Sequence, residues 1–133
     1  KNSKILSIDL KEVKEIFNVS HLIGDFLDEN NQLKLTNFFH DKLDLVVSDM
    51  AVNTTGNKNL DAISTGELSI NAMNFSIKNL KKNGSFVSKI FMGSTFNEIV
   101  GKCKKNFKEV KIFKPPSSRK DSKESFIICK KIR

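Results

Sequence analysis

The sequence has 133 residues and a net charge of +8, with 29% charged and 38% hydrophobic residues, which is typical of one globular domain. No apolar run approaches the roughly 18 residues of a membrane-spanning helix, and the opening KNSKILSIDL lacks the apolar core of a signal peptide, so we expect a cytoplasmic protein. The positive charge favours a polyanionic partner such as RNA, DNA or anionic lipid, although a solvated, lysine-rich surface explains it equally well.

The first half of the chain alternates short apolar runs with loops. Residues 4–9 (KILSID) and 21–26 (HLIGDF) are predicted strands that each end at or near an acid, and 30–39 (NNQLKLTNFF) is a predicted short helix. Residues 43–48 (LDLVVS) are almost continuously apolar, as expected of a strand that is covered on both faces.

In the second half of the chain, the spacing of the apolar residues changes. Apolar residues step by three and four between Leu60 and Leu80, which predicts a long helix that ends at the KKNG segment, with Gly84 as its C-terminal signal. The remaining predicted elements are a strand, a helix and two strands, in this order: 85–91, about 94–107, 109–114 and 124–131.

Strands that alternate with helices predict an α/β fold with a mostly parallel sheet and helices on both faces. The last two strands are separated by residues 115–123, a length that suits an antiparallel hairpin rather than a parallel crossover. Ligands of such sheets bind beyond the carboxyl ends of the strands, and Asp9, Asp25, Asp49 and Lys89 all lie at or near those ends. We therefore predict a functional site at that edge.

Lys89 stands out because it interrupts the apolar segment FVSKIF. A lysine in this position either runs its aliphatic stem along the core toward water or is held in a crevice beside carboxylates. Glu124 begins the last predicted strand, and taken alone it is best explained as an exposed acid at a strand end.

The two cysteines, Cys103 and Cys129, have no CxxC spacing and no neighbouring histidine, so no zinc or other metal site is predicted. Cys103 lies on an apolar helical stripe and Cys129 in an apolar strand. Buried free thiols explain this placement better than a disulfide does.

Three segments resemble the FtsJ/RrmJ family of ribosomal RNA 2′-O-ribose methyltransferases in order and approximate spacing: SDMAVNTTG (48–56), GSFVSKIF (84–91) and FKPPSSRKDSKESFIIC (113–129). The resemblance covers essentially the whole chain as a single domain, residues 1–133. It implies a Rossmann-like methyltransferase sheet and the cofactor S-adenosyl-L-methionine. The implied reaction is 2′-O-ribose methylation of a uridine in large-subunit (23S-type) ribosomal RNA.

The family uses a Lys-Asp-Lys-Glu tetrad, and the resemblance assigns its Asp, second Lys and Glu to Asp49, Lys89 and Glu124. It also implies that Asp9 and Asp25 bind the cofactor, with Asp49 near its methionine end. Carboxylates suit these roles, because they can accept hydrogen bonds from the ribose hydroxyls and the adenine amino group and can face the cofactor's cationic groups.

The family implies that Lys89 removes the proton of the ribose hydroxyl. A free lysine has a pKa near roughly 10.4 and is a poor base while it is charged. Desolvation lowers that pKa, whereas neighbouring carboxylates raise it, so Lys89 acts either as the base or as a cation that fixes the geometry of the nucleophile.

Basic residues offer contacts for the RNA backbone. In the loop SSRKDSK (117–123), Arg119 and Ser118 are predicted to bind substrate, since a guanidinium can fork onto a phosphate. Lysines near the predicted third helix are further candidates, although a solvated basic face explains them equally well: Lys102, Lys104, Lys105 and Lys108.

The sequence departs from the family at its start and in one loop. Family members carry a basic segment with the first tetrad lysine, then a first strand and a glycine-rich loop, and none of these is found here; Val52 replaces the usual proline. That strand lies centrally in the family's sheet, so its loss leaves backbone groups without partners. Either the chain is part of a longer protein, or residues 4–9 pair directly with 43–48, or a neighbouring molecule lends a strand. We expect weak cofactor affinity from these residues alone.

Two other functions compete with methyl transfer. A non-catalytic RNA-binding or ribosome-assembly module is favoured by the missing glycine-rich loop and opposed by the three tetrad positions. A nucleotide-dependent oxidoreductase on the same fold lacks its glycine fingerprint. The sequence does not indicate the oligomeric state.

Overall fold

The computed structural model describes residues 4–9, 17–39, 41–49, 58–91, 96–114 and 124–133, with the backbone alone at positions 9, 58–65, 91 and 124. The chain divides into two compact units, Lys1–Lys42 and Leu43–Arg133, which are described separately below. None of the described helices is long and apolar enough to cross a bilayer.

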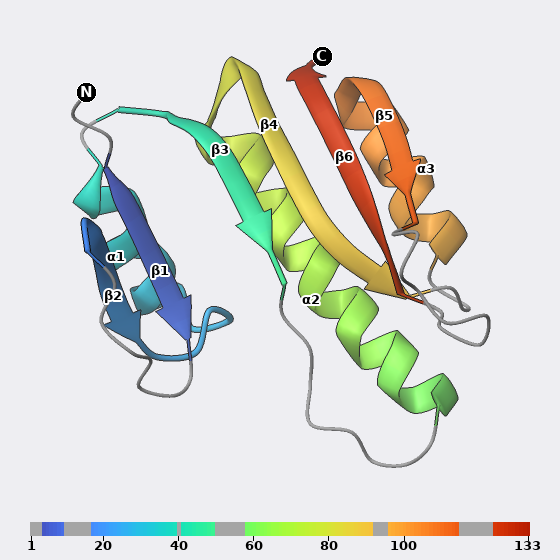
Figure 1. Cartoon of the computed structure of the whole chain (residues 1–133), viewed down its shortest axis with the longest axis horizontal. Coiled ribbons are helices and arrows are strands. Elements are labelled where there is room, and N and C mark those ends of the chain that lie inside the picture. The colour runs from blue at the N-terminus through green and yellow to red at the C-terminus, as the bar shows by residue number, and fades with distance from the viewer. Residues whose placement is uncertain (1–3, 10–16, 40, 50–57, 92–95, 115–123) are drawn as a thin grey trace. The chain divides into compact units, whose positions relative to one another are not determined.

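The first unit contains two parallel strands, β1 (Ile5–Asp9) and β2 (Val19–Ile23), followed by helix α1 (Glu29–Phe38) (Figure 1). The three predicted elements are confirmed, but β2 ends earlier than residue 26. The reason is a turn, in which the Leu27 amide donates to Asp25 Oδ1 at 2.9 Å and the Asp28 amide donates to the Asp25 carbonyl at 3.1 Å.

The second unit is built on a four-stranded sheet in the order β3-β4-β6-β5 (Figure 1). Its strands are β3 (Leu43–Ser48), β4 (Leu80–Phe91), β5 (Phe107–Phe113) and β6 (Glu124–Ile132). Strands β3 and β4 are parallel, whereas β6 is antiparallel to both β4 and β5. This arrangement confirms the predicted α/β fold with a final antiparallel hairpin, and it places the last strand between β4 and β5.

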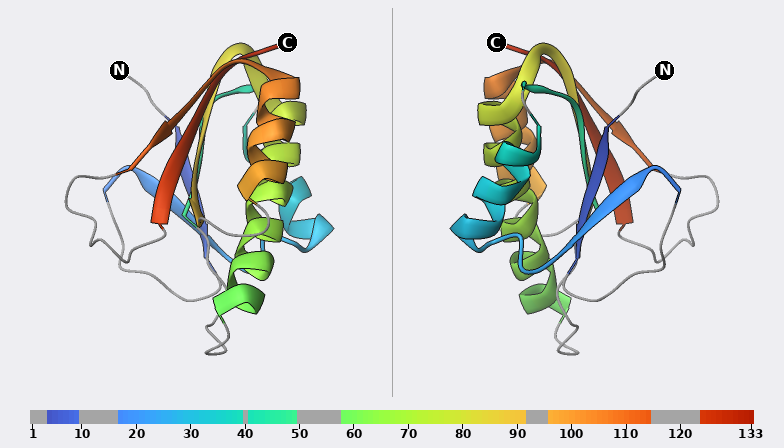
Figure 2. Two further views of the ribbon diagram at one scale, coloured as in Figure 1. Left: turned by 90° about the vertical axis from the view of Figure 1, so that its right-hand side faces the viewer. Right: turned by 90° about the vertical axis from the view of Figure 1, so that its left-hand side faces the viewer.

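The two helices of this unit, α2 (Lys58–Asn79) and α3 (Phe96–Asn106), lie on the same face of the sheet (Figure 2). Helix α2 packs on β4, and α3 packs on β5 and on α2. The phenyl rings of Phe86 and Phe107 stack with their centroids 6.4 Å apart. The core includes buried side chains from both helices and from strands β4, β5 and β6: Met73, Phe86, Ile90, Ile99, Cys103, Phe107, Ile127 and Cys129.

The predicted coverage of residues 43–48 on both faces is wrong. Leu45 and Val47 expose 54% and 62% of their surface, whereas Ser48 is buried. Strand β3 is at the edge of its sheet, and both helices of the unit pack on the same face. An apolar run therefore does not by itself show how many faces of a strand are covered.

Gly84 does not end the long helix, contrary to the prediction. Helix α2 ends at Asn79, and Gly84 lies inside β4 next to an irregularity in its pairing with β3. A Cβ atom at this position would lie 3.0 Å from the Lys81 carbonyl oxygen and 3.2 Å from the Asp44 carbonyl oxygen. The glycine is required because two backbone segments approach closely there.

One alternative from the sequence was direct pairing of residues 4–9 with residues 43–48, and the structure does not show this pairing. Strand β1 pairs with β2, and β3 pairs with β4, in two separate sheets. The described strands thus form two separate sheets, one in each unit.

Cys103 and Cys129 are free and fully buried, as predicted. The Cys103 thiol donates to Met73 Sδ at 3.4 Å, so α3 and α2 meet through sulfur atoms. A hydrogen bond with Cys103, together with burial, raises the pKa of the Cys129 thiol. Both residues therefore act as small hydrophobic core residues.

Candidate active site

Asp49 and Lys89 meet at the carboxyl edge of two neighbouring parallel strands. Asp49 directly follows β3, and Lys89 lies two residues before the end of β4. The register pairs Val47 with Val87 and Ser48 with Ser88, so positions 49 and 89 come next along the two strands. The strand pairing alone therefore brings these two side chains together.

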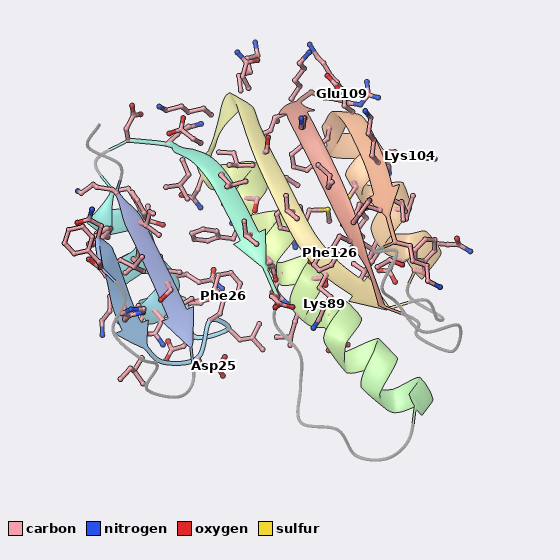
Figure 3. The ribbon with its side chains drawn as sticks, in the orientation of Figure 1. Asp25, Phe26, Lys89, Lys104, Glu109 and Phe126 are labelled. Atoms are coloured by element: carbon pink, nitrogen blue, oxygen red, sulfur yellow. The ribbon has the colours of Figure 1, made fainter. Side chains whose placement is uncertain are left out.

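Lys89 and Asp49 form an ion pair, with 3.0 Å between Lys89 Nζ and Asp49 Oδ1. The lysine side chain is only 18% exposed, whereas the aspartate side chain is 68% exposed. The apolar strand β4 thus holds the ammonium group near the surface. Figure 3 labels Lys89 near the carboxyl end of this strand. A carboxylate that faces solvent accompanies it. The structure confirms the predicted proximity of these two residues.

Glu124 is placed by its backbone. Position 124 pairs with Phe91 at the start of β6, and the Lys89–Phe126 pair lies two residues along the ladder. Diagonal positions of this kind on antiparallel strands are within reach of long side chains. The side chain of Glu124 lies outside the described residues, so its convergence with Lys89 stays a prediction.

Two buried serines behind Lys89 were missed by the sequence reasoning. The Ser69 hydroxyl on α2 donates to the Lys89 carbonyl oxygen at 3.1 Å, and the Ser88 hydroxyl lies 3.2 Å from Ser69 Oγ and 3.2 Å from the same carbonyl. Both serines are buried, with exposures of 2% and 0%. They attach the strand segment that carries Lys89 to helix α2. A serine in the apolar segment FVSKIF was the available signal.

The two predicted cofactor-binding acids, Asp9 and Asp25, lie at or near the ends of strands in the first unit. Asp9 is the last residue of β1 and pairs with Ile23 at the end of β2, and Asp25 follows two residues later. Asp25 Oδ1 accepts the hydrogen bond from the Leu27 amide, so this carboxylate also shapes the turn into α1. Because they belong to the other unit, the structure does not place these acids relative to Asp49 and Lys89.

The remaining predicted contacts divide between described and undescribed parts of the chain. Arg119 and Ser118 lie outside the described residues, as does Val52. The predicted phosphate-binding lysines lie on α3 and at the start of β5: Lys102, Lys104, Lys105 and Lys108. On α3, Lys102 forms an ion pair with Glu98 at 3.6 Å.

The mixed sheet, with a shielded lysine and a carboxylate at the carboxyl edge of adjacent parallel strands, is typical of Rossmann-like α/β proteins that bind ligands at that edge. The family model of the FtsJ-like methyltransferases matches residues 1–132. The chain therefore belongs to the FtsJ-like methyltransferase family.

Curated relatives include two proteins named ribosomal RNA large subunit methyltransferase E. The one from Pelagibacter ubique is 62% identical over 133 residues, covering 100% of this chain and 66% of the relative. The one from Rickettsia akari is 46% identical over 128 residues, covering 96% of this chain and 56% of the relative. The chain thus spans between about half and two thirds of the length of these relatives.

Solved structures agree on the fold. A ribosomal RNA methyltransferase from Plasmodium falciparum superimposes with a TM-score of 0.83 at 29% identity, over 97% of this chain and 72% of that chain. A methyltransferase from Streptococcus mutans in complex with SAH has a TM-score of 0.56 at 12% identity, over 96% and 71% of the two chains. The second likeness supports the fold alone.

Proposed function

We propose that this chain is part of an S-adenosylmethionine-dependent enzyme that methylates the 2′-hydroxyl of a uridine in large-subunit ribosomal RNA. The observation that carries the proposal is the 3.0 Å ion pair between Lys89 and Asp49, found in a member of the FtsJ-like family. The names of the Pelagibacter and Rickettsia relatives support ribosomal RNA as the substrate and the large ribosomal subunit as the partner. The family model spans both units, which supports treating residues 1–132 as one domain.

In this proposal Lys89 handles the proton of the ribose hydroxyl. Its Nζ is held by an apolar strand at the sheet edge and oriented by Asp49 Oδ1, so a hydroxyl that enters the edge meets a fixed nitrogen atom. The amine accepts the proton when it is neutral, whereas the ion pair with Asp49 favours the charged ammonium. Glu124 joins the group from the neighbouring strand, where the ladder puts position 124 two residues from the Lys89–Phe126 pair.

The acids of the first unit fit an adenosyl cofactor. Asp25 Oδ1 already accepts one backbone hydrogen bond, and a carboxylate has about four acceptor sites, so an amino group can be bound in addition. Asp9, at the end of the neighbouring strand, is suited to ribose hydroxyls. When bound, S-adenosylmethionine supplies the sulfonium methyl group that the hydroxyl oxygen attacks. Asp49 contributes a solvent-facing carboxylate that suits the cofactor's positive charge.

Methyl transfer from radiolabelled S-adenosylmethionine to large ribosomal subunits tests the proposal, with the full-length protein. We expect Lys89→Met to lower kcat by roughly 100- to 10,000-fold, because general-base catalysis contributes about that much. Lys81→Met is the matched control, since Lys81 is also on β4 and pairs with Asp44 on β3 at 3.2 Å, but the pair is exposed.

We expect the control to retain activity within about twofold, as is usual for an exposed ion pair. The product should carry its label on a ribose 2′-oxygen, which makes the adjacent phosphodiester resistant to alkali. Equal activity of the Lys89→Met variant and its control, or a label on a base, would overturn the proposal.

A further inference from the structure

The end of α3, the start of β5 and the end of β6 lie together in the second unit. The Arg133 amide donates to the Asn106 carbonyl at 2.9 Å, and Arg133 Nε donates to the Lys104 carbonyl at 2.9 Å. Phe107 pairs with Ile132 in the ladder between the two strands. These contacts fix residues 104–109 and 130–133 side by side as one surface.

This surface is strongly basic. Residues 104–109 and 130–133 contain six basic side chains, all exposed, which we call the basic end: Lys104, Lys105, Lys108, Lys130, Lys131 and Arg133.

The acid within these two segments is Glu109, which pairs with Lys131 at 2.9 Å. The hydrogen bond and charge of Lys131, with smaller contributions from Lys130 and Lys111, lower the pKa of Glu109 below its ordinary value.

The basic end is far from the Asp49–Lys89 pair. Lys89 pairs with Phe126, so Lys130 on β6 and Arg133, directly after β6, are four and seven residues further along the chain. At about 3.3 Å per residue, these positions lie roughly 13 to 23 Å from the lysine along the sheet. Figure 3 shows the separation, with Lys89 at one end of the sheet and Lys104 and Glu109 at the other.

A ligand that contacts both places must be an extended polyanion. A nucleotide or a cofactor is too short, whereas an RNA strand or helix carries regularly spaced phosphates over such a distance. A lipid surface fits less well, because stable binding to a membrane requires apolar side chains beside the basic ones. Of the hydrophobic residues next to these basic side chains, Cys103 and Phe107 are fully buried, and only Ile132 is partly exposed.

We propose that the basic end is a second RNA contact surface, which binds the ribose-phosphate backbone while the target nucleotide is at the opposite edge of the sheet. This inference rests on the proposed function for its substrate. The surface supplies affinity and orientation, since lysines at phosphates act as point charges that do not read the sequence. It therefore affects binding of RNA and leaves the chemical step unchanged.

The double variant Lys104→Gln/Lys130→Gln of the full-length protein tests the inference. Its matched control is Lys34→Gln/Lys42→Gln, which removes the same charge from exposed lysines outside the basic end. Filter binding to a transcript of large-subunit ribosomal RNA at several salt concentrations gives Kd and its salt dependence. Methyl-transfer assays give kcat and KM separately.

We expect the double variant to raise Kd and KM about tenfold relative to the control and to reduce the slope of log K against log salt by about 2. Its kcat at saturating RNA should equal that of the control. Equal Kd and slope for the two variants would overturn the inference. It would also be overturned if the variant lost binding only to anionic phosphatidylglycerol vesicles and kept its RNA affinity.

Failure of the proposed function gives a different result. A wild-type protein that binds RNA but transfers no methyl group would contradict the enzyme assignment. A Kd effect confined to the Lys104→Gln/Lys130→Gln variant would still support the basic end in that case, because binding is measured without turnover.

Discussion

The hydroxyl groups of Ser69 and Ser88 lie 3.2 Å apart in the core and both reach the carbonyl oxygen of Lys89. A residue on helix α2 and a residue on strand β4 thus share one acceptor, directly behind the lysine of the ion pair. Because the hydroxyls are buried, removing either one leaves the other with one hydrogen-bond partner fewer.

We expect Ser69→Ala and Ser88→Ala each to lower the free energy of unfolding by about 1 to 3 kcal/mol, since each leaves a buried polar group with fewer partners. The double variant should cost less than the sum by about 0.5 kcal/mol or more. Urea denaturation measures all three values.

Ser76→Ala is the matched control for this cycle, because Ser76 is also buried on α2 but donates to the Ala72 carbonyl within its own helix at 2.8 Å. Its effect should add to that of Ser88→Ala within about 0.5 kcal/mol. Strict additivity of Ser69→Ala and Ser88→Ala would contradict the shared network.

Under the proposed function, the ion pair of Lys89 with Asp49 should affect the chemical step. Asp49→Asn removes the charge of the carboxylate 3.0 Å from Lys89 Nζ, so the lysine should be positioned less well and kcat should fall by roughly 10- to 100-fold. Asp44→Asn, which changes the partner of the exposed Lys81, should leave kcat within about twofold. Equal kcat values for the two variants would show that Asp49 does not position Lys89.

Gly84 and Gly101 should respond oppositely to alanine. A Cβ at Gly84 would be 3.0 Å from the Lys81 carbonyl oxygen, whereas a Cβ at Gly101, inside α3, has nothing within 4 Å. We expect Gly84→Ala to destabilise the protein by about 1 to 3 kcal/mol through overpacking. Gly101→Ala should stabilise it by about 0.4 to 1 kcal/mol because alanine favours the helix. Thermal or urea unfolding measures both, and a stable Gly84→Ala variant would show that β3 and β4 separate easily.

The two thiols should be unreactive in the folded protein. Cys103 and Cys129 are both 0% exposed, so neither sulfur atom is accessible to a reagent in the folded protein. Ellman's reagent should detect none of these thiols before unfolding and both in guanidinium chloride. In guanidinium chloride, the reagent should detect one of these two thiols in the Cys103→Ala variant. Rapid labelling of the native protein would contradict the packing of α3 on the sheet.

The ion pair of Glu109 with Lys131 should stabilise the protein above mildly acidic pH. The folded pKa of Glu109 lies below its ordinary value of 4.5, so its contribution is present above about pH 4.5 and is lost as the pH falls through the folded value. Glu109→Gln should lower the melting temperature at pH 7 and converge with the wild type at low pH. In a Lys131→Gln background the same substitution should have a smaller effect, and an equal effect would assign the difference to another group.

The sequence was sufficient to predict the order of the elements and the proximity of Asp49 and Lys89. Alternating apolar runs predicted the strands correctly, and the segments SDMAVNTTG and GSFVSKIF led to Asp49 and Lys89. These residues could be found because Asp49 follows β3, Lys89 lies close to the end of β4, and neighbouring parallel strands end at the same sheet edge. Local pattern was therefore a good guide wherever strand direction alone determines position.

Features that depend on contacts between distant segments were not predictable in this way. The local sequence around Gly84 is compatible both with the end of a helix and with a strand. The approach of Asp44 from β3, a contact between distant segments, goes with its position in a strand. Leu45 and Val47 read as buried because the pattern does not show which face the helices cover. Ser69 likewise has a partner nineteen residues away, Ser88, that no periodicity reveals.

The central position of β6 affects when the sheet can form. Strand β6 is last in chain order, yet it lies between β4 and β5, and its pairing with β4 joins Ser85 to Lys130. During synthesis, β3 and β4 can pair early, but β5 has no sheet neighbour until residues 124–132 have left the ribosome exit tunnel. Such non-local pairing slows folding. The lysine-bearing strand β4 therefore gains its second neighbour only after residues 124–132 have been synthesised.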